Sequence, residues 1–182
     1  MSLYAKYKKE IIPTMQKEFG LKNRFMIPVL DKVVVNIGLS KVLIDPKFME
    51  IAENTLKKIT GQKPVKTRAK KAISNFKIKK GMPIGMMVTL RGKRMYDFIE
   101  KLIYVTLPRV RDFRGIPLTS LDQSGNLSIG MQEHTVFPEI KADEIEHVHG
   151  LEVSLITKGK DKIKSQRLFE ALGIPFAKNK KQ

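Results

Sequence analysis

Four stretches of the chain alternate between hydrophobic and polar residues, with the period of two that is typical of strands with one buried face. They cover residues 31–39, 86–91, 127–131 and 151–156. In the first stretch, the side predicted to be buried carries Val33, Val35, Ile37 and Leu39. The four stretches therefore predict strands of a sheet whose hydrophobic face packs on a core.

Hydrophobic residues three or four apart predict four helices. They cover residues 3–19, 45–61, 95–107 and 165–172. We expect Pro13 to kink the first helix, Asp45 to cap the start of the second, and Pro108 to end the third. Gly20, Gly61 and Gly173 follow the other three as stop signals.

Helices and strands interleave irregularly, which indicates an α+β fold. We predict a mainly antiparallel twisted sheet with helices on one face and a polar second face. No repeat or linker divides the chain, so we expect a single domain over residues 1–182, with a short basic tail at the C-terminus.

The composition is that of a folded protein with a large excess of positive charge. The 182 residues include 35 Lys and Arg against 18 Asp and Glu, a formal net charge of +17, and 42% are hydrophobic. The absence of cysteine excludes disulfides, cysteine-ligated zinc and thiol catalysis. The longest stretches without a charged residue, 81–90 and 123–132, are too short to span a bilayer, and we see no signal peptide. We therefore expect a cytoplasmic protein with a polyanionic partner, most simply nucleic acid.

The positive charge is concentrated in residues 54–96, which we call the basic tract. It contains no Asp or Glu, and its basic residues are Lys57, Lys58, Lys63, Lys66, Arg68, Lys70, Lys71, Lys77, Lys79, Lys80, Arg91, Lys93 and Arg94. The complete absence of acids favours binding of a polyanion, and a solvated lysine-rich surface is the alternative.

Residues 133–152, which we call the acidic segment, reverse this balance. Their acids are Glu133, Glu139, Asp143, Glu144, Glu146 and Glu152, against the single basic residue Lys141. Such a segment either faces solvent or binds a basic protein.

The predicted polar face of the sheet carries short hydrogen-bonding residues rather than long charged ones. Its members are Lys32, Asn36, Thr89, Arg91, Ser128, Gly130 and Ser154. Short polar side chains let a rigid partner approach closely and hydrogen-bond to the strands. An ordinary solvated face is the alternative.

Two further basic segments either bind a nucleic acid or have a structural role. Residues 70–85 predict an exposed loop or hairpin, in which Phe76 either contacts a nucleic acid or anchors the loop to the core. Residues 109–114 gather three arginines around Asp112, which either bind a phosphate or pair with that carboxylate.

No motif supports an enzyme. Gly92-Lys93 lacks the glycine and hydroxyl residue of a phosphate-binding loop, and residues 125–130 miss the spacing of a nucleophile elbow by one residue. His147 and His149, with acids nearby, could in principle form the metal site of a nuclease; surface histidines in an acidic loop are the favoured interpretation. We predict no enzyme, no cofactor and no bound metal.

Six ordered motifs resemble the bacterial form of large-subunit ribosomal protein five. They are residues 33–38, 61–64, 71–85, 88–98, 107–115 and 137–140. The resemblance covers nearly the whole chain. It departs at residues 122–126, which read Asp-Gln-Ser-Gly-Asn where the family has Asp-Gly-x-Gly-Asn.

This resemblance implies a constituent of the large ribosomal subunit that binds 5S rRNA and helps attach it in the central protuberance. The implied rRNA-binding residues are Lys32, Asn36, Gln62, Lys63, Thr89, Arg91 and Gly92. A non-ribosomal RNA chaperone or regulator is the rival interpretation, because a basic RNA-binding surface alone would suit either.

The resemblance also implies two further contacts. A loop would reach the peptidyl-site tRNA through Ser74, Asn75, Phe76, Lys77, Lys79 and Lys80. The acidic segment would bridge to small-subunit ribosomal protein thirteen, which is basic, through Glu139, Asp143, Glu144 and Glu146. Neighbouring large-subunit rRNA and proteins would be further partners, and no membrane or small-molecule substrate is expected.

Overall fold

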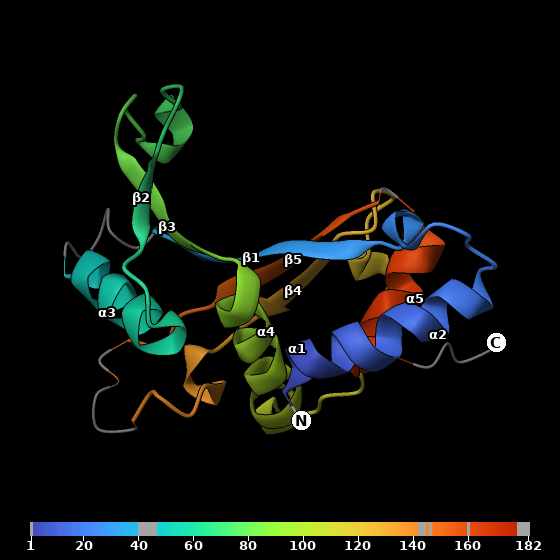
Figure 1. The fold of residues 1–182 in the computed structure, drawn as a ribbon. Helices are drawn as coiled ribbons and strands as arrows, with labels where there is room; N and C mark the ends of the chain where they lie inside the picture. The colour runs from blue at the N-terminus through green and yellow to red at the C-terminus, as the bar shows by residue number, and fades with distance from the viewer. Residues whose placement is uncertain (1, 40–46, 142–144, 146, 160, 178–182) are drawn as a thin grey trace, which may run out of the picture. The chain divides into compact units, whose positions relative to one another are not determined.

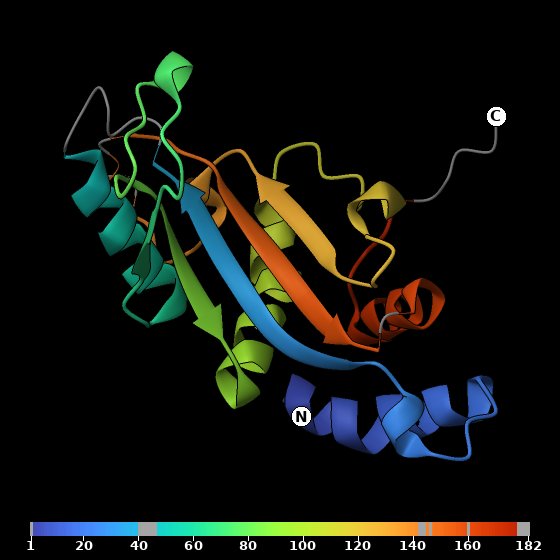
Figure 2. The same ribbon diagram turned by 90° about the horizontal axis from the view of Figure 1, so that it is seen from above.

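Five strands form one sheet, in the spatial order β2-β3-β1-β5-β4. Their bounds are Val29–Gly38 for β1, Val65–Arg68 for β2, Pro83–Leu90 for β3, Leu127–Met131 for β4 and Leu151–Lys158 for β5. The arrows of β3, β1, β5 and β4 alternate in direction (Figure 2), and β2 pairs antiparallel with β3. The predicted α+β fold with an antiparallel sheet is thus confirmed.

β2 is the strand that the hydrophobic pattern did not predict. Thr67 is half-buried, and the other three residues of β2 are exposed. An edge strand that buries neither face shows no alternation of hydrophobic residues. Its position is set by backbone pairing instead, with Val65 opposite Met87 of β3.

The structure is a computed structural model that describes residues 2–39, 47–141, 145, 147–159 and 161–177. The chain forms two compact units. The first unit comprises Met1–Val33, Leu90–Ile129 and Ser154–Gln182, and the second comprises Val34–Thr89 and Gly130–Val153. The single domain over residues 1–182 stays a prediction, and the basic C-terminal tail falls largely outside the described residues.

The predicted helix over residues 3–19 is confirmed as three consecutive segments of the first unit. They are α1 (Leu3–Lys6), the π-helical turn η1 (Tyr7–Ile11) and α2 (Ile12–Glu18). Pro13 lies in the first turn of α2, where a residue needs no backbone N–H to continue the helix. The distortion expected at Pro13 is therefore a π-helical turn immediately before it.

The two later predicted helices also belong to the first unit and are confirmed. α4 (Gly92–Lys101) continues through the π-helical turn η5 (Leu102–Thr106) into the 3-10 turn η6 (Leu107–Arg109), which contains Pro108. α5 (Lys162–Leu172) begins where the carboxylate of Asp161 accepts a hydrogen bond from the backbone N–H of Lys164 over 3.1 Å. It ends at Gly173, whose φ of 99° is left-handed.

In the second unit, α3 (Phe48–Thr60) confirms the helix predicted over residues 45–61 and ends at Gly61, whose φ is 67°. The proposed cap at Asp45 lies outside the described residues. The described residues also form short 3-10 turns: η2 (Arg24–Met26), η4 (Ser74–Phe76), η7 (Leu118–Ser120) and η8 (His134–Val136). None of the helices in the described residues has the length and apolarity that a membrane span requires.

The segment at residues 70–85 is a hairpin extension of β2 and β3, as predicted. Beyond the strands, the backbone N–H of Ala69 donates to the carbonyl of Met82, and Ile73 forms an isolated antiparallel bridge with Ile78. Figure 1 shows this extension rising from the second unit on the side away from α3.

The turn at residues 122–126 is closed by side-chain hydrogen bonds. The Asp122 carboxylate accepts from the backbone N–H of Asn126 over 2.7 Å and from its side-chain amide over 2.8 Å. Gly125 has a φ of 80°, and a Cβ added there would collide with the side chain of Ser165. Its carbonyl accepts a hydrogen bond from the hydroxyl of Thr157 over 2.8 Å. The turn therefore packs tightly against two other parts of the first unit.

We predict that Gly125→Ala lowers the free energy of unfolding by about 3 kcal/mol, because it adds a steric clash to backbone strain. Gly81→Ala is the matched control: its φ of 86° is similar, and an added Cβ there meets nothing within 4 Å. The control should lose only about 1 kcal/mol. Urea unfolding measures both, and equal losses would contradict the packing assigned to Gly125.

Candidate nucleic-acid interface

The candidate RNA-binding residues of the second unit are Asn36, Gln62, Lys63 and Thr89, which we call the amide group. Asn36 lies on β1 and Thr89 on the neighbouring strand β3, and both are half-buried. Gln62 follows the left-handed Gly61 that ends α3, and its side-chain amide donates to the backbone carbonyl of Thr89 over 3.3 Å. Gln62 and Thr89 are therefore brought together, although they are far apart in sequence.

The side chains of Asn36 and Thr89 are available to a ligand. Within the part of the chain that the structure describes, no group hydrogen-bonds to the Asn36 amide or to the Thr89 hydroxyl. Gly85 of β3 lies close to Asn36, because a Cβ added there would be 3.7 Å from the Asn36 Oδ1. The neighbouring strand thus places no bulky side chain at this point.

The candidate residues of the first unit are Lys32, Arg91 and Gly92, which we call the arginine group. Lys32 is half-buried on β1, and Arg91 is exposed at the N-cap position of α4. Gly92 has a φ of 60° and nothing within 4 Å of an added Cβ, so the backbone there is open to a partner. This combination offers two cations and an accessible backbone.

A carboxylate that the sequence pattern did not reveal lies beside Arg91. The Asp31 Oδ1 accepts from the guanidinium Nη1 of Arg91 over 2.9 Å and from the Nζ of Lys158 over 3.1 Å. The hydrogen bond from Lys158 and the charge of Arg91 together hold the pKa of Asp31 below its usual range. Asp31 opens the strand predicted over residues 31–39 and Lys158 lies beyond the strand predicted over residues 151–156, so the hydrophobic pattern placed neither beside Arg91.

The other members of the predicted polar face lie where the alternation placed them. Ser128 and Gly130 are exposed, and Ser154 is half-buried. The hydroxyl oxygens of Ser128 and Ser154, both in the first unit, are 3.2 Å apart. Their neighbours Leu127, Ile129, Val153 and Leu155 are buried.

The predicted tRNA-contacting residues are all exposed at the tip of the hairpin extension. They are Ser74, Asn75, Phe76, Lys77, Lys79 and Lys80. The Phe76 side chain is 65% exposed, so the alternative that Phe76 anchors the loop to the core is wrong. Lys77 has a φ of 54°, which turns the chain back after η4.

At residues 109–114, no salt bridge joins Asp112 to an arginine within the described chain. The alternative of internal pairing is therefore wrong for this segment. Asp112 instead occupies a left-handed backbone conformation, with a φ of 52°.

Two family models match this chain. The model of ribosomal protein L5 matches residues 23–79, and the model of the C-terminus of the same ribosomal family matches residues 83–176. The chain belongs to the ribosomal protein L5 family. The resemblance inferred from the six motifs is thus confirmed.

Full-length relatives of this L5-family chain carry the name large ribosomal subunit protein uL5. That of Caldanaerobacter subterraneus subsp. tengcongensis is 51% identical over 176 residues, 97% of this chain and 98% of the relative. That of Halothermothrix orenii is 48% identical over 177 residues, covering 97% and 99%. That of Thermotoga maritima is 49% identical over 174 residues, covering 96% and 95%.

Membership in the L5 family establishes the general role. The chain is a structural constituent of the large ribosomal subunit, with roles in RNA binding and translation. The prediction that it is not an enzyme is confirmed, because the family is structural. The same finding favours the ribosomal interpretation over a free-standing RNA chaperone.

The acidic segment of the L5-family chain is only partly described. Glu139 is half-buried, and Glu133 accepts a hydrogen bond from the hydroxyl of Thr135 over 3.1 Å. Asp143, Glu144 and Glu146 lie outside the described residues. The assignment of these four acids to a basic protein partner stays a prediction.

Two of the three histidines, His134 and His149, form a buried stack that the sequence pattern did not predict. The rings of His134 and His149 are 4.1 Å apart and nearly parallel, and both residues are at most 5% exposed. The Nε2 of His149 is 3.4 Å from the Thr55 hydroxyl on α3, and its ring meets Phe48 edge to face. The prediction of surface histidines is therefore wrong for His149, whereas His147 is exposed.

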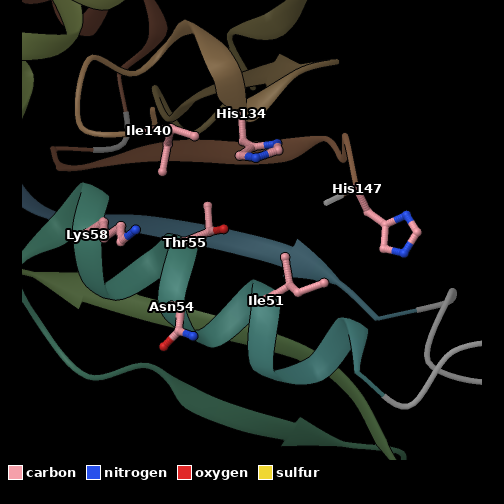
Figure 3. A pocket seen from close by; sticks show the side chains of 7 residues that line it. All are labelled: Ile51, Asn54, Thr55, Lys58, His134, Ile140 and His147. Carbon is pink, nitrogen blue, oxygen red and sulfur yellow. The ribbon is translucent and has the colours of Figure 1, made fainter. Parts of the chain in front are cut away.

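A metal nuclease site has no support in the described residues. No group of three or more His, Cys, Asp or Glu there could hold a metal ion. A cavity of about 120 Å³ is lined by His134 of the stack. Ile51 and Thr55 of α3 and Ile140 also line this cavity (Figure 3). The remaining lining residues are Asn54, Lys58 and His147. The stack lies within the second unit, where His149 contacts Thr55 and Phe48 of α3.

We predict that acid destabilises this chain through His134. Burial lowers the pKa of His134 in the folded state, so the unfolded chain binds the proton more readily. The free energy of unfolding should therefore fall as the pH drops below about 6.5, by up to about 1.4 kcal/mol per pH unit for one such group.

Chemical unfolding of the wild type and two variants between pH 7.5 and pH 5 tests this prediction. His134→Gln should show a shallower pH dependence than the wild type. Asn54→Gln, a change at an exposed residue that lines the same cavity and carries no titratable group, is the control and should keep the wild-type slope. A wild-type slope in His134→Gln would contradict the assignment.

Proposed function

We propose that this L5-family protein binds 5S rRNA and helps attach it in the central protuberance of the large subunit. The observation that carries the proposal is a pair of side chains on adjacent strands, the Asn36 amide and the Thr89 hydroxyl, that have no hydrogen-bond partner within the described residues. A ligand that covers these half-buried groups must hydrogen-bond to them, because each group left unpaired after burial would cost about 1–3 kcal/mol. The basic tract on either side of Thr89 favours a phosphate-bearing ligand.

RNA suits the amide group better than DNA does. An RNA helix has a wide, shallow minor groove that displays 2′-hydroxyls, and a strand surface with short polar side chains can approach it closely. Asn36, Gln62 and Thr89 would hydrogen-bond to sugars, phosphates or base edges. Lys63 would contribute affinity through charge, as Lys32 and Arg91 would in the first unit.

The proposal extends to two further partners. The exposed hairpin tip, with Phe76 and three lysines, would contact the peptidyl-site tRNA. The acidic segment would contact small-subunit protein thirteen, on the ground of opposite charge. Both contacts would take place in the cytoplasm, on the assembled ribosome.

We predict that Asn36→Ala or Thr89→Ala weakens 5S rRNA binding by about 1–3 kcal/mol each, because each removes a hydrogen bond in a desolvated interface. Asn54→Ala is the matched control, since Asn54 is exposed on α3 and lines the cavity beside the histidines. A filter-binding titration gives the three affinities. Wild-type affinity in both test variants would overturn the role of the amide group.

We predict a different result for the hairpin tip. Replacing Lys77, Lys79 and Lys80 together by Gln should leave 5S rRNA affinity within about twofold, because the tip is separate from the amide group. The same variant, assembled into ribosomes, should release peptidyl-site tRNA faster, since phosphate contacts are lost. An unchanged release rate would remove the tRNA contact.

A further inference from the structure

Asp31 is an acidic residue among the candidate RNA-binding cations of the first unit. Its carboxylate lies between Arg91, at the end of β3, and Lys158, at the end of β5, and β1 lies between those two strands in the sheet. Arg91 donates a second hydrogen bond from Nη1 to the backbone carbonyl of Asp31, over 3.3 Å. Asp31 on the central strand β1 thus pairs with one cation at the end of each neighbouring strand, β3 and β5.

The three side chains of this cluster, Asp31, Arg91 and Lys158, differ strongly in their exposure to solvent. The carboxylate side of this cluster is largely covered, since the Asp31 side chain is 19% exposed, whereas those of Arg91 and Lys158 are 55% and 73% exposed. A ligand that approaches the cluster therefore meets the two cations first. The three charges sum to one positive charge, so a phosphate is still attracted.

Asp31 reaches this position because the alternation of β1 is interrupted there. Leu30 and Val33 are both buried, and the two residues between them, Asp31 and Lys32, are half-buried. A period of two would place Asp31 on the buried face with Val33, whereas Asp31 is only half-buried. This irregularity explains why the period-two pattern did not place Asp31 beside Arg91.

A carboxylate on a phosphate-binding surface repels the ligand unless it has another role. Arg91 uses only its Nη1 for Asp31, so the remaining guanidinium N–H groups stay available. Lys158 likewise keeps donors beyond the one that it directs at Asp31. When a flexible cationic side chain is held in place before binding, less side-chain conformational entropy is lost on binding a ligand.

We propose that Asp31 is a positioning residue that orients Arg91 and Lys158 toward phosphates of a folded RNA, and that Lys158 is itself a phosphate-contacting residue. The inference rests on the proposed 5S rRNA binding and adds two residues to it. The negative charge of Asp31 weakens the non-specific attraction of any RNA. By orienting Arg91 and Lys158, Asp31 strengthens the binding of a folded RNA. Its removal therefore has opposite effects on the two kinds of RNA.

The test compares Asp31→Asn with Asp97→Asn, a matched loss of one negative charge at an exposed position of α4 in the same unit. Affinities are measured for 5S rRNA and for an unstructured RNA of equal length. Asp31→Asn should bind 5S rRNA about fivefold more weakly than Asp97→Asn does, and the unstructured RNA at least as tightly. Asp31→Glu, which keeps the carboxylate, should recover part of the loss.

Three outcomes distinguish a failure of the positioning role of Asp31 from a failure of the proposed 5S rRNA binding. Binding of 5S rRNA by Asp31→Asn that equals or exceeds that of Asp97→Asn would overturn the positioning role. A parallel loss for both RNAs would indicate a damaged fold and would also overturn it. If the wild type shows no preference for 5S rRNA, the proposed function fails instead.

The contact by Lys158 has its own readout. Lys158→Met should reduce by about one the slope of log affinity for 5S rRNA against log salt concentration, because one phosphate contact is lost. Asp31→Asn should leave that slope unchanged, since Asp31 touches no phosphate. An unchanged slope in Lys158→Met would remove Lys158 from the interface.

Discussion

The burial of one face of β1 is the constraint on which the site depends. Val33, Val35 and Ile37 are at most 1% exposed, and burying each such side chain stabilises the fold by about 1.5–3 kcal/mol. A slip of one residue would expose all of them and bury Asn36. The hydrophobic core therefore fixes which polar side chains β1 presents, and the position of Asn36 in the amide group follows from the core.

Charge and hydrogen bonding have separate roles in this account. Lysines and arginines supply attraction to any polyanion, and salt screens it. Hydrogen bonds to the side chains of Asn36 and Thr89, and contacts to the cations around Asp31, form only with a partner of matching shape. A net charge of +17 thus describes how strongly the chain attracts RNA, whereas the backbone of the sheet decides which RNA fits.

The regular elements were predictable from sequence, because alternation and capping are local signals. Four strands, the helix stop at Gly61 and the polar face with Asn36 and Thr89 all follow from them. The exposed edge strand β2, the Asp31 cluster and the stack of His134 on His149 did not. Each depends on pairing between distant residues, which no local pattern records.

The most direct test of the central claim is site-specific photocrosslinking of the protein bound to 5S rRNA. A photoreactive residue is placed in turn at position 36, at position 89 and, as a control, at position 54 on α3. The account predicts crosslinks to 5S rRNA from positions 36 and 89 and background yield from position 54. Crosslinks from position 54 alone would contradict the assignment of the polar sheet face to RNA.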